Sequence, residues 1–308
     1  AISGSILVSQ TEYRLKEIGS TENNYICPHL IVTESWQTII WKISTQNTKP
    51  GRLPALERGI QRRHFIKQEE SSSPVGEGIG KAIVRAFRGA GHRVAFCDKN
   101  ETLGKETALQ TGTQFHLVDV SDKTALEDCL RKIIEEWGDI DIIINNAGVS
   151  QFSPITETSV EDFDKILSIN LRPAFITSRQ LALHRQSLDI PNPYGRIINI
   201  CSTRYLMSEP GSEGYAASKG GIYSLTHGWL IALGMAYHGK PIAPGWIQNN
   251  NYDQLRPEDH AQHPSGRVGK PEDIARMCLF LCQEENDFIN GENITIDGGM
   301  TKKMIYLD

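Results

Sequence analysis

Residues 140–148 read Ile-Asp-Ile-Ile-Ile-Asn-Asn-Ala-Gly, a nearly continuous apolar run that ends in two asparagines. Branched apolar residues without polar alternation are typical of a strand that is covered on both faces of a sheet. Outward from this run, apolar runs alternate with amphipathic stretches from about residue 76 onward. That order is the pattern of βαβ units, which build a parallel sheet. The sequence therefore predicts an α/β domain over residues 76–308.

The same alternation places the individual elements. Strands are expected at 93–97, 114–120, 140–144, 196–201 and 293–297. Helices are expected over 79–90, over 121–137 with Ser121 as the N-cap, over 159–186, over 215–233 and, after a proline start, over 271–282.

The first 75 residues show no consistent period. Short apolar pieces at 30–33 and 39–41 are joined by polar stretches and by the linker-like segment 47–51. We predict an irregular N-terminal extension, residues 1–75, which can include a degraded first strand. Two interpretations stay open: a loosely structured extension, or an erroneous or truncated translation upstream of the domain.

Charge and cysteine content exclude several function classes. The net charge of -5 and a pI near 6.0, without a run of Lys or Arg, argue against a nucleic-acid-binding surface. The six cysteines form no CxxC pair, so they indicate neither a disulfide framework nor a metal site, and Cys278 and Cys282 are interpreted as core residues.

A membrane span and a secretory signal are not predicted. Residues 220–239 carry no Asp, Glu, Lys or Arg, but two histidines and several glycines favour a buried helix there. The N-terminus has no basic stretch followed by an apolar core. We therefore expect a cytoplasmic protein without metal, membrane or nucleic-acid partners.

Glycines and an aspartate suggest a nucleotide site. Gly76-Glu77-Gly78-Ile79-Gly80 opens the first predicted helix, where backbone N–H groups and the helix N-terminus can approach a pyrophosphate. Asp98 ends the next strand, where a carboxylate can bind an adenosine ribose and repel a 2′-phosphate. A surface aspartate alone has the same appearance, but the combination favours NAD over NADP.

Tyr215 and Lys219 lie four residues apart on one face of a predicted helix. A phenol titrates near about 10, and a nearby ammonium favours the phenolate, which makes the tyrosine a usable general acid and base. The pair alone is common on helices. Ser202, thirteen residues before Tyr215 at the end of a predicted strand, adds weight to it.

These motifs follow one order along the chain: Gly78-Ile79-Gly80, Asn145-Asn146-Ala147-Gly148, Ser202, Tyr215-Ala216-Ala217-Ser218-Lys219, Pro244-Gly245 and Asp297-Gly298-Gly299. In order and spacing the set resembles the short-chain dehydrogenase/reductase family over residues 76–308. The resemblance implies a single domain with a Rossmann-like, doubly wound parallel sheet. It also implies hydride transfer between a carbinol carbon and a nicotinamide cofactor, so the expected substrate is an alcohol or a ketone.

The resemblance further implies residue roles. The catalytic set is Asn170, which holds a proton-relay water, Ser202, which binds the substrate oxygen, Tyr215, which moves the proton, and Lys219, which binds the nicotinamide ribose. The cofactor contacts are Gly76, Gly78, Ile79, Gly80, Asp98, Asp119, Val120, Asn146, Ala147, Gly148, Tyr215, Lys219, Pro244, Gly245 and Ile247, with Asp119 near the adenine and Ile247 near the nicotinamide amide. Family members pair the helices that correspond to 159–186 and 215–233, so a homodimer or homotetramer is expected.

Two segments depart from the family pattern. The strand before the glycines usually ends in Thr-Gly, whereas this chain has Ser73 and Pro74 there, after the adjacent Glu69 and Glu70. Residues 30–33 are a better strand by composition but would place a long insertion before the glycines. Residues 237–241 read Tyr-His-Gly-Lys-Pro, in which Gly and Pro weaken a central strand.

The sequence thus predicts an NAD-preferring oxidoreductase that interconverts a secondary alcohol and a ketone. A 3-oxoacyl reductase and a sugar or polyol dehydrogenase both stay open, because sequence does not decode the substrate-selecting segments 203–213 and 247–268. The alternative from another class is a non-catalytic or cofactor-impaired protein on the same fold, which the two departures motivate.

Overall fold

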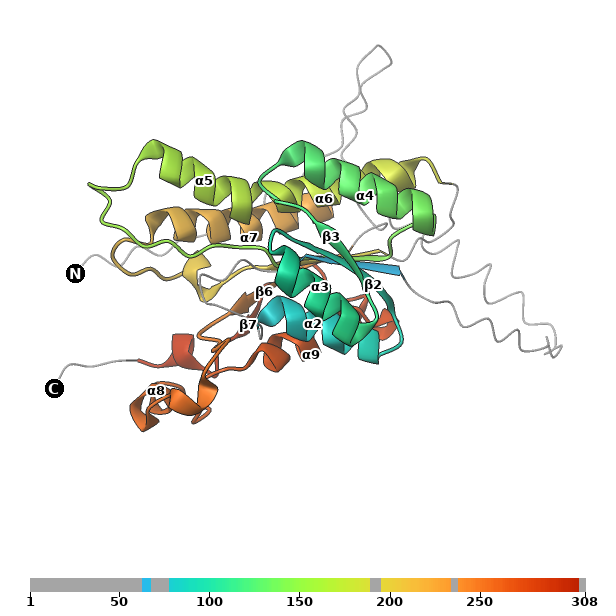
Figure 1. Cartoon of the computed structure of the whole chain (residues 1–308). Helices are drawn as coiled ribbons and strands as arrows, with labels where there is room; N and C mark the ends of the chain where they lie inside the picture. The colour runs from blue at the N-terminus through green and yellow to red at the C-terminus, as the bar shows by residue number, and fades with distance from the viewer. Residues whose placement is uncertain (1–62, 68–77, 189–194, 234–237, 305–308) are drawn as a thin grey trace, which may run out of the picture. The chain divides into compact units, whose positions relative to one another are not determined.

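The computed structural model describes residues 63–67, 78–188, 195–233 and 238–304. These residues contain a seven-stranded parallel sheet in the order β3-β2-β1-β4-β5-β6-β7 (Figure 1). The strands are β1 (Arg63–Lys67), β2 (Arg93–Asp98), β3 (Gln114–Leu117), β4 (Ile142–Asn145), β5 (Arg196–Ile200), β6 (His238–Pro244) and β7 (Ile294–Ile296). The order reverses between β1 and β4, as in a Rossmann-like doubly wound sheet.

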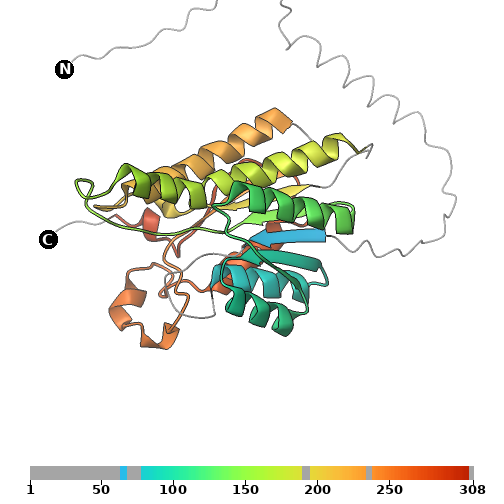
Figure 2. The same cartoon turned by 45° about the horizontal axis from the view of Figure 1, so that its top comes forward.

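Helices cover both faces of the sheet, as Figures 1 and 2 show. One face carries α4 (Lys123–Trp137), α5 (Val160–Asn170), α6 (Arg172–Gln186) and α7 (Glu213–Leu233), and the other carries α2 (Ile79–Gly89), α3 (Glu101–Thr111) and α9 (Pro271–Leu281). Within these layers α4 packs against α6, α5 against α7 and α2 against α9. The short helix α8 (Pro257–Ala261) lies between β6 and α9 along the chain.

The burial of β4 explains why its sequence lacks polar alternation. Ile143 packs into an apolar cluster with residues of α4 and α6. Ile142 and Ile144 point the other way, into a cluster with residues of α2 and α9. All three side chains are nearly inaccessible to solvent. The prediction of a strand covered on both faces is therefore confirmed.

The helical layer differs from the prediction in two respects. The single helix expected over 159–186 is wrong: Leu171 separates α5 from α6, and Pro173, which has no N–H to donate, stands in the first turn of α6. In addition, α3 and α8 are helices that the periodicity does not predict. α3 buries only Gly104 and Thr107, so it has no apolar stripe from which a helix could be predicted.

The N-cap of α4 is Asp122 rather than the predicted Ser121. The Asp122 carboxylate accepts hydrogen bonds from the N–H groups of Thr124 and Ala125. The Ser121 hydroxyl instead donates to the Asp119 carboxylate at 2.7 Å. Asp122 is therefore the better N-cap, because its carboxylate both accepts hydrogen bonds from the unpaired N–H groups of the first turn and interacts favourably with the helix dipole.

β1 occupies the place of the first strand. Arg63–Lys67 pairs in parallel with β2 on one side and with β4 on the other. The strand ends at Lys67, before the two adjacent glutamates. Several residues of the earlier expectations lie outside the described residues: Glu69, Glu70, Ser73, Pro74, Gly76 and the alternative strand at 30–33.

The second departure from the family pattern is accommodated in β6. Pro241 is paired with Asn199 of β5 within the parallel ladder. Gly239 lies against α7, where an added Cβ would approach Thr226 Cγ2 to 3.1 Å. The expected weakening by Gly and Pro therefore does not prevent a strand at 238–244, while Tyr237 lies outside the described residues.

Lys240 of β6 is completely buried. Its ammonium donates hydrogen bonds of 2.6 Å to the carbonyl oxygens of Leu281 and Asn286, at the end of α9 and just beyond it. Burial lowers the pKa of Lys240 to about 8, and the positive charge of Arg196 adds to that effect. The lysine thus joins β6 to the segment after α9.

Candidate active site

The parallel register brings the carboxyl ends of the strands to one edge of the sheet. A candidate residue lies at or after the end of each of six strands. These residues are Gly78 (after β1), Asp98 (the last residue of β2), Asp119 (after β3), Asn146 (after β4), Ser202 (after β5) and Gly245 (after β6). Ligands of doubly wound sheets bind at this edge, next to the point where the strand order reverses. The candidate residues therefore lie along this one edge of the sheet, on both sides of the reversal between β1 and β4.

Tyr215 and Lys219 lie in the first turns of α7. Lys219 is only 3% exposed, and its ammonium donates a hydrogen bond of 3.0 Å to the Ile200 carbonyl at the end of β5. The same ammonium lies 5.5 Å from the centre of the Tyr215 ring. The helical spacing thus brings the charge beside the phenol, while the strand carbonyl holds it in place.

Asn170 connects the end of α5 to the loop after β4. Its carboxamide accepts a hydrogen bond from the Val149 N–H (2.8 Å) and donates one to the Val149 carbonyl (3.0 Å). It also donates to the Ser218 hydroxyl at 3.0 Å, next to Lys219 on α7. The buried side chain is therefore a fixed link between three elements at the site.

Gly148 lies between these groups. An added Cβ there would be 3.3 Å from Lys219 Nζ and 3.6 Å from Asn170 Oδ1. A larger side chain would press on the lysine, so the small residue keeps the ammonium where it is. Gly148, Asn170 and Lys219 are thus brought together, as the motif spacing predicts.

Ser202 is the N-cap of the short 3₁₀ helix η2 (Thr203–Tyr205), which packs against α7. Its hydroxyl oxygen accepts a hydrogen bond of 3.2 Å from the Arg204 N–H. Because a hydroxyl has one donor and two acceptor sites, its hydrogen stays available for another oxygen. The side chain is nearly buried, at the rim of the region that contains Tyr215.

A chain of buried polar side chains lies behind the site. Asn145 of β4 donates to Asn199 of β5, and Asn199 donates to Thr226 of α7, each at 2.8 Å. Thr177 of α6 donates to Asn145, also at 2.8 Å. These linked hydrogen bonds are not predicted from the sequence. A signal for them is Asn199 inside the run Ile-Ile-Asn-Ile, because a polar residue in a buried strand needs a partner.

The proposed cofactor-contact residues have features that fit a bound nucleotide. Asn146 is 1% exposed, and neither its amide nitrogen nor its amide oxygen has a hydrogen-bond partner among the described residues. Among the described residues, no atom lies within 4 Å of the Cβ position at Gly78, so these residues leave the N-terminus of α2 open, with Ile79 and Gly80 buried behind it. The orphaned amide and the open helix end could both be satisfied by a ligand.

The remaining contact residues also lie near this edge. Gly245 is in close contact with the next strand end, since an added Cβ would be 2.6 Å from Asp297 Cβ. Ile247 forms a parallel bridge with Gly269. Val120, Ala147 and Pro244 are buried, and Gly76 lies outside the described residues.

Asp98, at the end of β2, and Asp119, after β3, have carboxyl groups whose pKa values are shifted in opposite directions. Burial raises the pKa of the Asp98 carboxyl to about 6, although the N–H groups of Asn100 and Lys99 favour its ionised form. For Asp119, partial burial opposes ionisation, but hydrogen bonds from Ser121 outweigh it and lower the pKa of that carboxyl. Asp98 is thus a carboxyl whose charge is costly in the folded protein.

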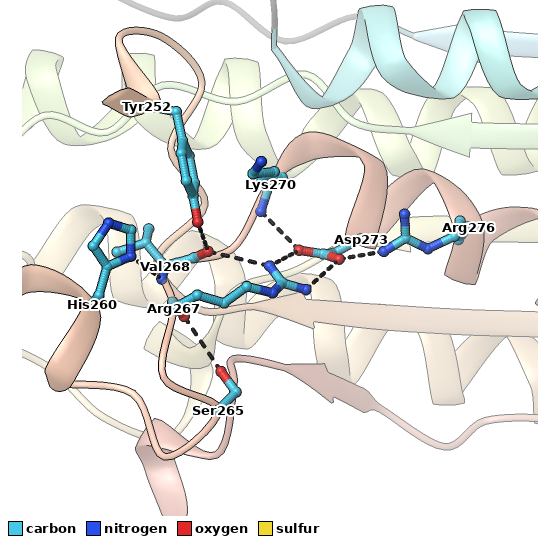
Figure 3. Close-up of polar contacts among 8 residues, drawn as sticks. All are labelled: Tyr252, His260, Ser265, Arg267, Val268, Lys270, Asp273 and Arg276. Carbon is cyan, nitrogen blue, oxygen red and sulfur yellow. Dashed lines mark hydrogen bonds and ion pairs between the residues drawn. The ribbon is translucent and has the colours of Figure 1, made fainter. Parts of the chain in front are cut away.

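The loop between β6 and α9 is held at its base by charged and polar contacts (Figure 3). Arg267 makes two hydrogen bonds to Asp273, of 2.7 and 2.8 Å. The Tyr252 hydroxyl donates to the Val268 carbonyl at 2.7 Å, and the Lys270 ammonium lies 4.3 Å from the centre of the Tyr252 ring. This loop contains residues 247–268, one of the two segments that are expected to select the substrate.

Other kinds of site were also considered within the described ranges. No group of three or more His, Cys, Asp or Glu side chains among these residues could hold a metal ion. Cys278 and Cys282 are buried and form no disulfide with another described residue. Of the helices in this part of the chain, none is long and apolar enough to cross a membrane.

Known proteins share this arrangement. A family model described as Enoyl-(Acyl carrier protein) reductase matches residues 75–301. An uncharacterized oxidoreductase of Thermotoga maritima is 40% identical over 247 residues, which cover 75% of this chain and 94% of the relative. The chain belongs to the short-chain dehydrogenase/reductase family.

Other members of the short-chain dehydrogenase/reductase family match this chain over almost all of their own length. The 3-oxoacyl-[acyl-carrier-protein] reductase FabG of Thermotoga maritima is 30% identical over 233 residues, covering 72% of this chain and 93% of the relative. The structure of an apo SCOR enzyme from Clostridium thermocellum covers 80% of this chain and 96% of that chain, with a TM-score of 0.70 and 38% identity. As a short-chain dehydrogenase/reductase, the protein is an oxidoreductase that acts on CH–OH donors with a nicotinamide cofactor.

Asp98→Asn is expected to stabilise the free protein at pH 7.5 by about 1 to 2 kcal/mol, after allowance for the partial exposure of the group. The pKa is raised on folding from 3.8 to about 6, so the cost of the buried charge is absent below pH 3.8, grows between these values and is complete above about 6. The gain should therefore shrink at pH 4.5.

Urea unfolding of both proteins at the two pH values measures this gain. Asp164→Asn, at an exposed position of α5, is the control and should change the unfolding free energy by less than about 0.5 kcal/mol at either pH. An equal gain for Asp98→Asn at pH 4.5 and 7.5 would contradict the explanation by charge.

Proposed function

We propose that the protein is an NAD-preferring oxidoreductase that interconverts a secondary alcohol and a ketone. The observation that carries this proposal is the meeting of Tyr215, Lys219 and Asn170 beside Gly148 at the carboxyl edge of the sheet. Ser202 follows the neighbouring strand β5. A bound nicotinamide supplies the hydride acceptor or donor for such a reaction.

The proposed chemistry of the protein's own side chains is proton transfer. Tyr215 takes the proton from the carbinol hydroxyl in oxidation and returns it to the carbonyl oxygen in reduction. The ammonium of Lys219 lies beside the Tyr215 ring, and it keeps two N–H donors after its hydrogen bond to Ile200. Ser202 would bind the substrate oxygen through its hydroxyl hydrogen, since its oxygen already accepts a hydrogen bond from the Arg204 N–H.

The proposed role of Asn170 is partly that of a positioning residue. Its carboxamide groups are engaged by Val149 and Ser218, so it holds the loop after β4 against α7. Because that loop carries Gly148, the position of Lys219 depends on it. The predicted relay water at Asn170 stays a prediction.

In the proposed cofactor site, the pyrophosphate would lie at the N-terminus of α2, where Gly78 leaves the helix end open. The adenosine ribose would be bound by Asp98, and the adenine would lie near Asp119 and Val120. Asn146, Ala147 and Gly148 would border the nicotinamide side, together with Pro244, Gly245 and Ile247. The preference for NAD rests on Asp98, whose charge repels a 2′-phosphate.

Tyr215→Phe is expected to lower kcat by about 10³-fold, because the lost hydroxyl is the proton donor and acceptor. The Kd for NADH should stay within about twofold. Assays with a panel of secondary alcohols and ketones, together with a fluorescence titration of NADH, measure the two effects. Tyr223→Phe on the same helix, whose ring packs on Tyr205, is the matched control and should keep most of its turnover. Full turnover by Tyr215→Phe would rule out this mechanism.

NADH is expected to bind at least about tenfold more tightly than NADPH, a difference of about 1.4 kcal/mol. Asp98→Ala should weaken NADH binding and bring the two Kd values within about threefold, because the repulsion of the 2′-phosphate is lost. Titrations followed by nicotinamide fluorescence give these constants. Binding of neither cofactor to the unchanged chain would favour the cofactor-impaired alternative, and tighter NADPH binding would overturn the preference.

The proposed assembly is a homodimer or homotetramer formed through α6 and α7. A shallow apolar groove on these helices is lined by Leu171, Phe175, Gly221, Ser224, Leu225, Gly228, Trp229 and Ala232. Phe175 is 46% exposed although its ring packs on Trp229. Small residues beside large apolar ones allow a second helix pair to approach closely. The buried free cysteines of the described residues support a reducing, cytoplasmic location.

Gly228→Glu is expected to reduce the assembly to a monomer of 34.4 kDa, because it places charges in the groove. None of the described residues has an atom within 4 Å of the added Cβ, so the fold should persist. Light scattering after size-exclusion chromatography measures the mass. Gly89→Glu, at an equally open position on α2, is the control and should keep the mass of the unchanged protein. A monomeric unchanged protein would contradict this assembly.

A further inference from the structure

Phe152 lies beside the candidate proton-transfer residue. Its ring packs edge to face on Tyr215, with centroids 6.0 Å apart and an angle of 82° between the ring planes. Half of the Phe152 surface is nevertheless exposed. An aromatic ring that touches the phenol and still faces solvent is within reach of a group bound at the phenol hydroxyl.

The backbone around Phe152 is held in place. The N–H of the next residue, Ser153, donates a hydrogen bond of 3.1 Å to the Gly211 carbonyl. Gly211 has a φ of +80°, and an added Cβ there would lie 3.0 Å from the Ser153 carbonyl oxygen. The loop after β4 and the loop before α7 are therefore joined at this point. The second loop also exposes Leu206 and Met207, so both loops present apolar surface.

In the described loop before α7 and the described loop between β6 and α9, each Lys and Arg side chain has a partner. Arg204 forms an ion pair with Glu209 in the loop before α7. In the loop between β6 and α9, Arg256 pairs with Asp259 at 2.7 Å and Arg267 with Asp273 at 2.7 Å, while Lys270 lies over the Tyr252 ring (Figure 3). The loop at 149–159 has no Lys or Arg. A substrate carboxylate or phosphate would have to displace one of these partners.

We infer that Phe152 determines specificity and that the substrate is a neutral carbinol or ketone with an apolar substituent, aromatic or aliphatic, which packs on the exposed part of that ring. This inference rests on the proposed function, because it takes Tyr215 as the group that contacts the reacting oxygen. Dispersion and edge-to-face contact with Phe152 select the substituent. A substrate anion would have to compete with the present partners of these loop cations, which disfavours sugar acids.

The test compares four substrates with the full chain and NAD: 1-phenylethanol, 2-propanol, sorbitol and gluconate. We expect kcat/KM for 1-phenylethanol to exceed that for each of the others by at least about tenfold. Phe152→Ala should lower kcat/KM for 1-phenylethanol by about 10- to 50-fold and that for 2-propanol by less than about threefold. Phe152→Leu, which keeps an apolar surface, should recover part of the loss.

Phe288→Ala is the matched control, since Phe288 is 99% exposed and lies between α9 and β7; it should change neither constant. An equal loss on 1-phenylethanol and 2-propanol in Phe152→Ala would overturn the inference, because Phe152 would then act only through the position of Tyr215. Better turnover of sorbitol or gluconate than of 1-phenylethanol would also overturn it but leave the proposed function intact. Turnover of none of the four, with NAD or NADP, would overturn both.

Discussion

The hydrogen bond between the Asn145 and Asn199 side chains joins the carboxyl ends of the two central strands, β4 and β5, where neither amide meets solvent. Buried amides must find partners, so this pair stabilises one register of the two strands against all others. Thr177 and Thr226 attach α6 and α7 to the same pair. Because α7 carries Lys219 and the chain continues from β4 to Gly148, the closeness of these two residues depends on that register.

Much of the fold could be predicted because its signals are local. The apolar run at 140–144 predicts a strand buried on both faces, and the two clusters that cover β4 confirm it. Features decided by distant partners could not be predicted. Asn145 and Asn199 are 54 positions apart, and only the folded sheet brings them together. Likewise, Ser121 is a good N-cap by type, but its hydroxyl is bound to Asp119 and its carbonyl accepts a hydrogen bond from Arg172.

The candidate site likewise has features that local sequence signals predict and features that depend on distant partners. Motif spacing predicts that Tyr215 and Lys219 share a face of α7, and it places Gly148 and Ser202 after neighbouring strands. The electrostatic character of the surrounding loops depends on pairs such as Arg267 with Asp273, whose geometry no motif describes. The candidate site therefore combines one buried ammonium, that of Lys219 beside Tyr215, with neighbouring loops in which Arg204, Arg256 and Arg267 are paired with carboxylates.

Because Lys240 is completely buried, its chemical modification depends on a motion of the protein. Its amine is enclosed by β6 and by the carbonyl groups of Leu281 and Asn286, so no acylating reagent can reach it in the closed structure. Modification requires the segment after α9 to separate from the sheet, and the rate of labelling then follows the population of that open state. Since β6 leads directly into Gly245 and Ile247, the labelling rate of this single amine reports how often the sheet opens next to these two residues.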